Sequence, residues 1–203
     1  MNKMNKIGLL ILAITLGATF GLHAQKRMVL IEKGSEIIIS GSSNVHDWDM
    51  KVVKIKGSLD LSPDIETHKS FDKIDVSLNP KNIKSHSSIM DNKTYAALKA
   101  NKYPSIGFNM TSINNLKING ASFSAEIVGV LKVAGKSKKV ILNSVGIFNS
   151  DNSLTTTGIL DMKMTDFGIN PPTAMMGAMK TGDDIRIKFN LTFGPDLNTL
   201  TNK

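Results

Sequence analysis

The chain has 203 residues, and its 25 Lys and Arg against 17 Asp and Glu give a formal net charge of +8 at pH 7. The lysines are spread along the whole chain and form no basic patch with interleaved aromatic residues, so the charge argues against a nucleic-acid partner. It indicates a solvated basic surface, with weak attraction to anionic lipid headgroups as the alternative. The sequence contains no cysteine, which excludes disulfides and leaves the core alone to stabilise the fold.

The first 24 residues have the pattern of an export signal. Lys3 and Lys6 precede an uncharged apolar run over residues 7–20, and "LHA" ending at Ala24 is an acceptable cleavage site. The run is too short for a comfortable membrane span. We therefore expect residues 1–24 to be a cleaved signal peptide and residues 25–203 to form a single mature domain in a bacterial periplasm.

The segment "SGSSNVHDWDM" places serines, a histidine and two aspartates beside the only tryptophan. Strand alternation sends His46 and Trp48 to one face and Asp47 to the other, which is the wrong arrangement for a Ser-His-Asp relay. There is no GxSxG, HxH or HExxH motif, so we expect no catalytic residues and no metal site. Two interpretations remain. Either Trp48 packs inward with His46 hydrogen-bonded near one end of the fold, or both line a ligand entrance and meet a polar headgroup.

Alternating apolar and polar residues predict an all-β chain. We expect a short lead-in at residues 28–31 and eight main strands at residues 35–42, 44–61, 71–79, 106–118, 121–133, 136–148, 154–165 and 185–193. Along residues 44–61 the apolar residues change from even to odd positions, and so from one face of the strand to the other. The even set is Trp48, Met50 and Val52, and the odd set is Val53, Ile55, Leu59 and Leu61. This switch predicts a bulge or sharp coil near Val52 and Val53. One helix is expected at residues 92–100, with Asp91 as its N-cap.

Two short turns predict the inner face of the central strands. In "LKINGASF", Asn119 and Gly120 suit a type I′ turn that pairs Ile118 with Ala121. The same register forms apolar pairs further along: Leu116 with Phe123, Met110 with Gly129, and Phe108 with Leu131. A second two-residue turn, at Gly135 and Lys136, adds four residues to this face, namely Val140, Leu142, Gly146 and Phe148. The two turns therefore predict one common interior.

Eight mostly sequential antiparallel strands can close into an up-and-down barrel, which removes exposed strand edges. Such a barrel either holds one slender ligand or is filled by its own side chains. The small residues Gly129, Gly146, Gly158 and Ala125 favour an open passage. The residues expected to line a tunnel are Phe108, Met110, Phe123, Ile127, Leu131, Leu142, Leu160, Met162, Phe189 and Leu191. His46 and Trp48 are expected at its entrance.

Methionines are concentrated near the end of the chain. Five occur within 18 residues: Met162, Met164, Met175, Met176 and Met179. The stretch "NPPTAMMGAMKTGDD" is too long for an ordinary hairpin connection. Its methionines either plug one end of the barrel or form a lid that adapts to a flexible ligand, in which case Met175 and Met176 contact that ligand.

Four stretches carry a resemblance to a known family: "NKYPSIGFNMTSI", "EIVGVLKVAGKSKKVIL", "TDFGIN" and "DDIRIKFNLTF". In order and spacing they resemble the YceI-like proteins, exported lipocalin-like barrels associated with binding polyisoprenoid lipids. The resemblance implies an eight-stranded antiparallel lipocalin-like β-barrel with one short helix, a long apolar tunnel and no catalytic residues. It implies no cofactor other than a bound isoprenoid-type lipid. The segment "HDWDMKVVKIKG" departs from the apolar or glycine-containing segment of many members.

Three functional classes follow. The first is an exported protein that sequesters or carries an elongated isoprenoid-like amphiphile without chemistry, with at most peripheral membrane contact. The second is a stress-response or protein-interaction barrel that binds another small amphiphile or nothing. The third is an enzyme such as an isomerase or hydrolase, and the predicted interior counts against it because it contains no apposed titratable groups.

Overall fold

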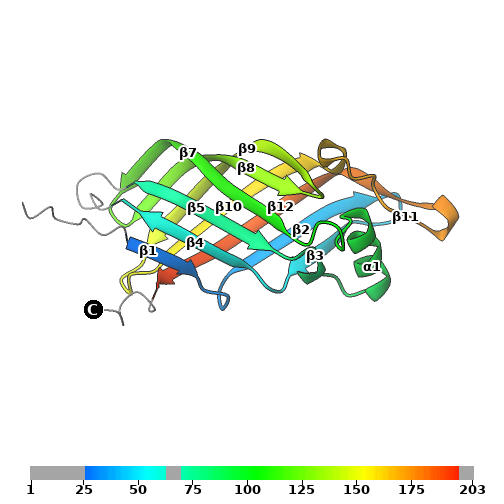
Figure 1. The fold of residues 1–203 in the computed structure, drawn as a ribbon, viewed down its shortest axis with the longest axis horizontal. Helices are drawn as coiled ribbons and strands as arrows, with labels where there is room; N and C mark the ends of the chain where they lie inside the picture. Colours follow the sequence, from blue (N-terminus) through cyan, green and yellow to red (C-terminus); the bar gives the residue numbers. More distant parts are fainter. Residues whose placement is uncertain (1–25, 63–69, 197–203) are drawn as a thin grey trace, which may run out of the picture.

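The computed structural model describes residues 26–62 and 70–196, so the expected signal peptide lies outside the described residues. Eight antiparallel strands form a closed ring (Figure 1): β1 (Lys26–Leu30), β4 (Lys56–Leu61), β5 (Phe71–Leu78), β7 (Ile106–Asn119), β8 (Ser122–Val133), β9 (Lys136–Phe148), β10 (Leu154–Lys163) and β12 (Met179–Pro195). Each strand pairs with the next in this order, and β12 pairs with β1 to complete the ring. The predicted eight-stranded antiparallel β-barrel is confirmed. Its strands differ from the predicted set, because the expected lead-in at residues 28–31 belongs to β1 of the ring, whereas the expected strand at residues 35–42 lies outside the ring.

A second set of elements extends one end of the barrel. β2 (Glu36–Ser43) pairs with β12, β3 (Trp48–Val52) with β2, and β6 (Ile83–Lys84) with β3. The helix α1 (Ser88–Ala97) lies at this end, as does β11 (Thr173–Ala174), which pairs with the start of β12 (Figure 1). The 3-10 helices are η1 (Pro80–Asn82), η2 (Met164–Phe167) and η3 (Met175–Gly177). In the described part of the chain, no helix is long and apolar enough to cross a membrane.

The opposite end of the barrel is filled by side chains. Phe71, Phe123 and Phe148 form an aromatic cluster there, with ring centroids 5.2 to 6.4 Å apart. The most buried apolar residues of the neighbouring strands complete it: Met28, Leu59, Leu154 and Phe193. Because large rings contribute much of the buried area in a small core, this cluster closes the barrel at the end where β1 meets the C-terminal part of β12.

The β7–β8 hairpin has the predicted pairing only in its half away from the turn, where Met110 lies opposite Gly129. Near the turn the prediction is wrong, because Ile118 pairs with Phe123 and not with Ala121. Two register shifts along the hairpin absorb this two-residue difference. Since two one-residue bulges restore the original parity, the inward face survives the error.

The turn between β8 and β9 is formed by Ala134 and Gly135, both with positive φ, one residue earlier than predicted. The predicted inner face of β9 is nevertheless confirmed. Val140, Leu142 and Phe148 are partly buried and pack against the core. The shift again preserves the alternation of the strand, which is what determines its inner face.

The expected strand over residues 44–61 is two strands. β3 ends at Val52 and β4 begins at Lys56, so the predicted coil near Val52 and Val53 is confirmed. Val53 is 58% exposed, which makes its expected inward orientation wrong, whereas Ile55 is buried. Residues 44–47 form a turn before β3, in which the Ser43 hydroxyl donates to the His46 carbonyl at 2.7 Å.

The helix α1 begins four residues before the predicted start, and its N-cap is Ser87. The prediction that Asp91 caps it is wrong. Asp91 is buried in the first turn, where one carboxylate oxygen accepts from the backbone N–H and the hydroxyl of Ser85 at 2.7 and 2.8 Å. Burial opposes the charged form, but these hydrogen bonds and Lys84 outweigh it and hold the pKa of Asp91 below its ordinary value. Asp91 thus fastens the loop before α1 to the helix.

Candidate ligand-binding cavity

The barrel encloses a cavity of about 630 Å³ with an almost entirely apolar lining. At one end the lining includes Phe123 and Leu154, which are at most 4% exposed, so this end is closed. At the other end it includes Ile89 of α1 and Met175 of η3, which are 70% and 73% exposed. Among residues 26–62 and 70–196, the cavity therefore has its mouth at the end of the barrel where α1 and β11 lie. A volume of this order suits one small or slender ligand.

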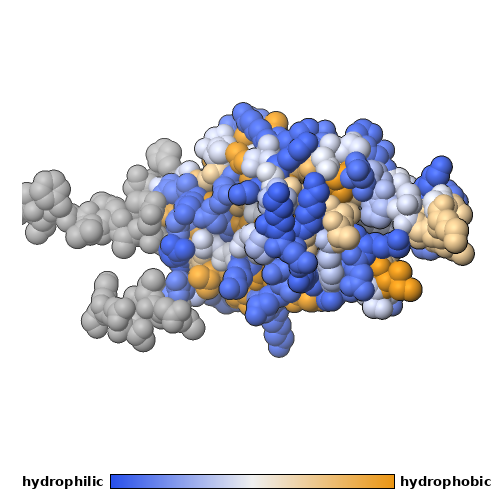
Figure 2. Space-filling view, turned by 45° about the vertical axis from the view of Figure 1, so that its right-hand side comes forward, coloured by the Kyte–Doolittle hydropathy of each residue, from blue (hydrophilic) through white to orange (hydrophobic). Residues whose placement is uncertain are grey.

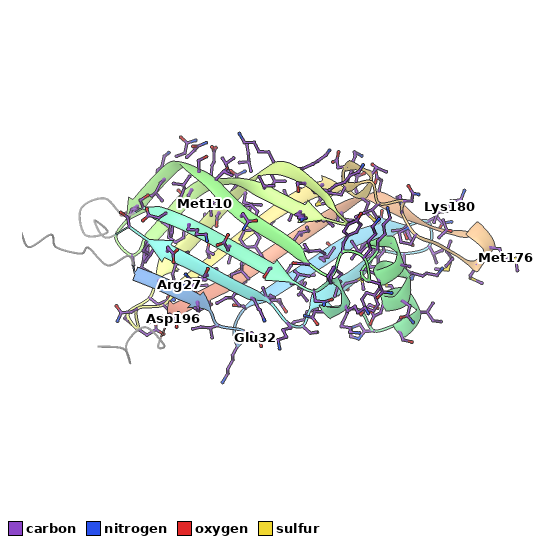
Figure 3. The ribbon with its side chains drawn as sticks, in the orientation of Figure 1. Arg27, Glu32, Met110, Met176, Lys180 and Asp196 are labelled. Atoms are coloured by element: carbon purple, nitrogen blue, oxygen red, sulfur yellow. The ribbon has the colours of Figure 1, made fainter. Side chains whose placement is uncertain are left out.

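All but two of the residues predicted to contact a ligand line this cavity: Phe108, Phe123, Ile127, Leu131, Leu142, Leu160, Met162, Phe189, Leu191, His46, Trp48 and Met175. Met110 does not. It is partly buried and packs against the core, opposite Gly129 and next to a bulge of β7. Met176 does not either, because it is fully exposed at the tip of the β11–β12 loop (Figure 3). Contact with a ligand stays a prediction for the others.

Sequence reasoning missed the part of the lining that comes from β2 and α1. Ile37 and Ile39 face the cavity, while Ile38 is paired between lysines of β3 and β12. Three consecutive isoleucines hid this alternation. Met90 and Ala97 of α1 also line the cavity. Their spacing of seven residues puts them on one helix face, a signal that the misplaced helix start obscured.

The expectation that three glycines leave free space along the axis is wrong. A Cβ atom on any of them would collide with an aromatic ring and with a backbone carbonyl oxygen. The rings belong to Phe108 at Gly129, Phe123 at Gly146 and Phe189 at Gly158. Each glycine therefore accommodates a ring of the adjacent strand against the barrel wall, as glycines in strands often do where another group approaches closely.

Polar groups are few in the lining. The hydroxyl of Thr156, deep in the barrel, is 2.6 Å from that of buried Ser144, so both are paired. The ionisable lining residues are His46, Lys93 and Lys180, and the described lining contains no carboxylate. Among residues 26–62 and 70–196 no group of three or more His, Cys, Asp or Glu could hold a metal ion. This arrangement can bury an apolar molecule.

His46 and Trp48 show features of both interpretations drawn from the sequence, because each makes a local hydrogen bond and each lines the cavity. The Trp48 indole N–H donates to the Ser42 carbonyl at 2.9 Å, and its ring covers Gly41. One ring nitrogen of His46, Nδ1, is 2.7 Å from the Asp47 carbonyl oxygen. Both side chains also line the cavity. The indole N–H is already satisfied, so the expectation that it meets a headgroup is not supported, and contact of the imidazole with a headgroup stays a prediction.

A closed barrel around a one-ended apolar cavity, with a helix beside the mouth, defines a ligand-binding β-barrel. The YceI-like domain matches residues 29–193, and the chain belongs to this family. The comparison with curated proteins gave no match.

Solved structures share the fold. Burkholderia cenocepacia BcnA has a TM-score of 0.65 and 15% identity, over 80% of this chain and 98% of that one. A domain from Saccharophagus degradans is described as polyisoprenoid-binding and implicated in plant cell wall breakdown. It has a TM-score of 0.63 and 9% sequence identity, over 85% of this chain and 99% of that one. The Campylobacter jejuni YceI protein has a TM-score of 0.54 and 22% sequence identity, over 68% of this chain and 80% of that one.

Proposed function

We propose that this protein is an exported lipid-binding protein that holds an elongated isoprenoid-like amphiphile in its barrel, without catalysis. The observation that carries the proposal is the cavity itself, which has an almost entirely apolar lining, is closed by Phe71 and Phe123 at one end and is open beside α1 at the other. A slender hydrocarbon tail would enter first and fill the closed end. Its polar headgroup would remain at the mouth, near His46, Lys93 and Lys180.

Burial alone would hold such a ligand. A tail that hides roughly 400 Å² of apolar surface gains about 10 kcal/mol at about 25 cal/mol per Å², before the costs of binding are subtracted. The deep hydroxyls of Ser144 and Thr156 are paired with each other and so do not oppose an apolar chain. The protein could therefore keep a nearly insoluble molecule dispersed in water.

Three further observations support the proposal. The Saccharophagus degradans domain of the same fold is described as polyisoprenoid-binding. The described lining has no carboxylate, which leaves no acid–base pair for chemistry on a ligand. The apolar run over residues 7–20 and the cleavage site "LHA" ending at Ala24 fit export to a periplasm. The open cavity also disfavours a barrel filled by its own side chains.

Native mass spectrometry of the mature protein, purified gently from its own cells, tests this function. A stoichiometric adduct should appear, and organic extraction should release a long-chain isoprenoid. Recovery of a fatty acyl lipid would keep the carrier role and change the ligand class. A protein that is repeatedly empty, and that refuses polyprenyl and quinone ligands when they are offered, would contradict the proposal.

A further inference from the structure

Exposed apolar side chains surround the mouth of the cavity. Met175 and Met176 project from the β11–β12 loop, Ile89 from the first turn of α1, and Val45 from the β2–β3 connection. They are 73%, 109%, 70% and 59% exposed. In Figure 2 the projecting loop presents apolar surface among hydrophilic surface. Large apolar side chains gathered on three separate segments at one end of a molecule mark an interaction site.

The backbone holds the two methionines outward in an unusual conformation. Met175 and Met176 have φ of 49° and 53°. These values lie in the left-handed region, which residues other than glycine, Asn and Asp seldom adopt. Such backbone persists where the surrounding structure imposes it, and it is concentrated at functional sites. Figure 3 shows Met176 at the far tip of the loop, away from the barrel. This position excludes the expected plug for that residue.

Hydrogen bonds join the three segments into one platform. Lys93 of α1 donates to the Thr173 carbonyl at 2.7 Å, which links the helix to β11. The side chain of Asn44, next to Val45, donates to the Ala178 carbonyl and accepts from the Lys180 backbone N–H, both at 2.8 Å. The mouth therefore presents its apolar residues from a connected surface and not from independent loops.

The charges of this surface favour an anionic partner. Lys93 and Lys180, which belong to the segments that form the platform, are exposed and line the mouth. The described segments 44–47, 88–97 and 173–182 contain two acidic residues, Asp47 and Asp91, and Asp91 is buried against Ser85 and paired with Lys84. Lysines near anionic headgroups add attraction to the burial of apolar side chains in the headgroup region.

We propose that the mouth docks on the surface of an anionic phospholipid bilayer, with Met175, Met176, Ile89 and Val45 buried among the headgroups. This inference rests on the proposed function, because a mouth pressed on a bilayer lets a hydrocarbon chain pass into the cavity without crossing water. The surface and the cavity are continuous, since Ile89 and Met175 belong to both.

The test uses the mature protein and vesicles of phosphatidylcholine, alone or with one quarter phosphatidylglycerol. Met176→Ser combined with Val45→Ser removes two platform residues that are not part of the cavity lining. Ile141→Ser combined with Val145→Ser is the control, because it removes two exposed apolar residues, 53% and 56% exposed, from the outer face of β9. Flotation should show that the parent protein binds the anionic vesicles. Binding should fall about tenfold for the platform variant and stay unchanged for the β9 variant.

Uptake of a fluorescent polyprenyl probe dispersed without vesicles separates docking from cargo binding. If the platform variant takes up the probe normally and loses vesicle binding, docking is supported. If the parent takes up the probe but ignores anionic vesicles, or if both double variants bind vesicles equally, docking is overturned and the carrier function stands. If vesicle binding depends on the platform but no probe is taken up, docking is supported and the proposed cargo is wrong.

Discussion

The aromatic ring of Phe189 occupies the space that a side chain at Gly158 would need. The two residues pair directly across β10 and β12, and a Cβ atom on Gly158 would also lie 2.8 Å from the Asn143 carbonyl oxygen. The ring contact recurs at Gly146, which also pairs directly with Phe123, and at Gly129, where the ring is that of Phe108 although the direct partner on β7 is Met110. The glycines thus help to keep the lumen open indirectly, because each lets a large ring lie against the barrel wall.

Gly158→Ala should lower the free energy of unfolding by about 1 to 3 kcal/mol, because the added methyl meets a backbone carbonyl as well as a ring. Urea unfolding followed by circular dichroism measures this. Gly107→Ala is the matched control, since its nearest neighbour would be the Val76 carbonyl oxygen at 3.8 Å, and it should change stability by less than about 0.5 kcal/mol. Equal losses at both sites would show that the ring contact has no role.

The inner faces of the central strands could be predicted from the sequence because they depend on alternation more than on register. Bulges set the limit of that reasoning. Between the two bulges of the β7–β8 hairpin, Ile113 lies opposite Ile127 and packs against the core. Alternation counted from the turn would instead place Ile113 on the solvent-exposed face of the strand. Asn115 there has φ of 51°. Asn tolerates this conformation, but two consecutive asparagines do not distinguish a bulge from a turn.

The mouth could not be predicted, because it is made by contacts between distant segments. The bonds from Lys93 to Thr173 and from Asn44 to Ala178 join residues separated by 80 and 134 positions. The pairing of β6 with β3 likewise brings α1 to the end of β2. No local periodicity encodes these contacts, so the sequence identified the methionine-rich loop without showing where its methionines point.

Trp48 and His46 should differ sharply in their effect on stability. Trp48→Ala removes a half-buried ring that covers Gly41 and a hydrogen bond to Ser42, and it should cost about 2 to 4 kcal/mol. His46→Ala removes an exposed side chain and should cost less than about 0.5 kcal/mol. Thermal unfolding of the two variants checks this difference. A comparable loss for His46→Ala would mean that its contact with the Asp47 carbonyl oxygen stabilises the turn before β3.

Asp91→Asn should destabilise the protein at neutral pH and reduce its sensitivity to acid. The carboxylate is buried, and despite that burial the hydrogen bonds from Ser85 and the Lys84 ammonium hold its pKa below the ordinary value of 3.8. A carboxyl with a lowered folded-state pKa contributes stability above its unfolded-state pKa and loses it as pH falls through the folded-state pKa.

At pH 7, Asp91→Asn should lower the free energy of unfolding by about 1 to 3 kcal/mol, because it weakens the buried hydrogen bonds of a charged group. Thermal unfolding between pH 7 and pH 2 measures it, and the difference between parent and variant should shrink below about pH 4. Asp161→Asn is the control, because the Asp161–Arg186 pair is exposed and screened by water, so its loss should change stability little at any pH. A difference for Asp91→Asn that is constant with pH would contradict the assigned role of its charge.

Leu160→Trp should block ligand binding while the barrel stays folded. Leu160 lines the cavity from β10, and the larger side chain can extend into open space, so the overpacking cost of about 1 to 3 kcal/mol that a filled core imposes should not arise. Affinity for a polyprenyl probe should fall at least about tenfold, since the indole occupies volume that the tail requires. Lys132→Glu, on the exposed outer face of β8, should change neither stability nor probe affinity. A stable Leu160→Trp variant that binds the probe as tightly as the parent would place the ligand outside the barrel.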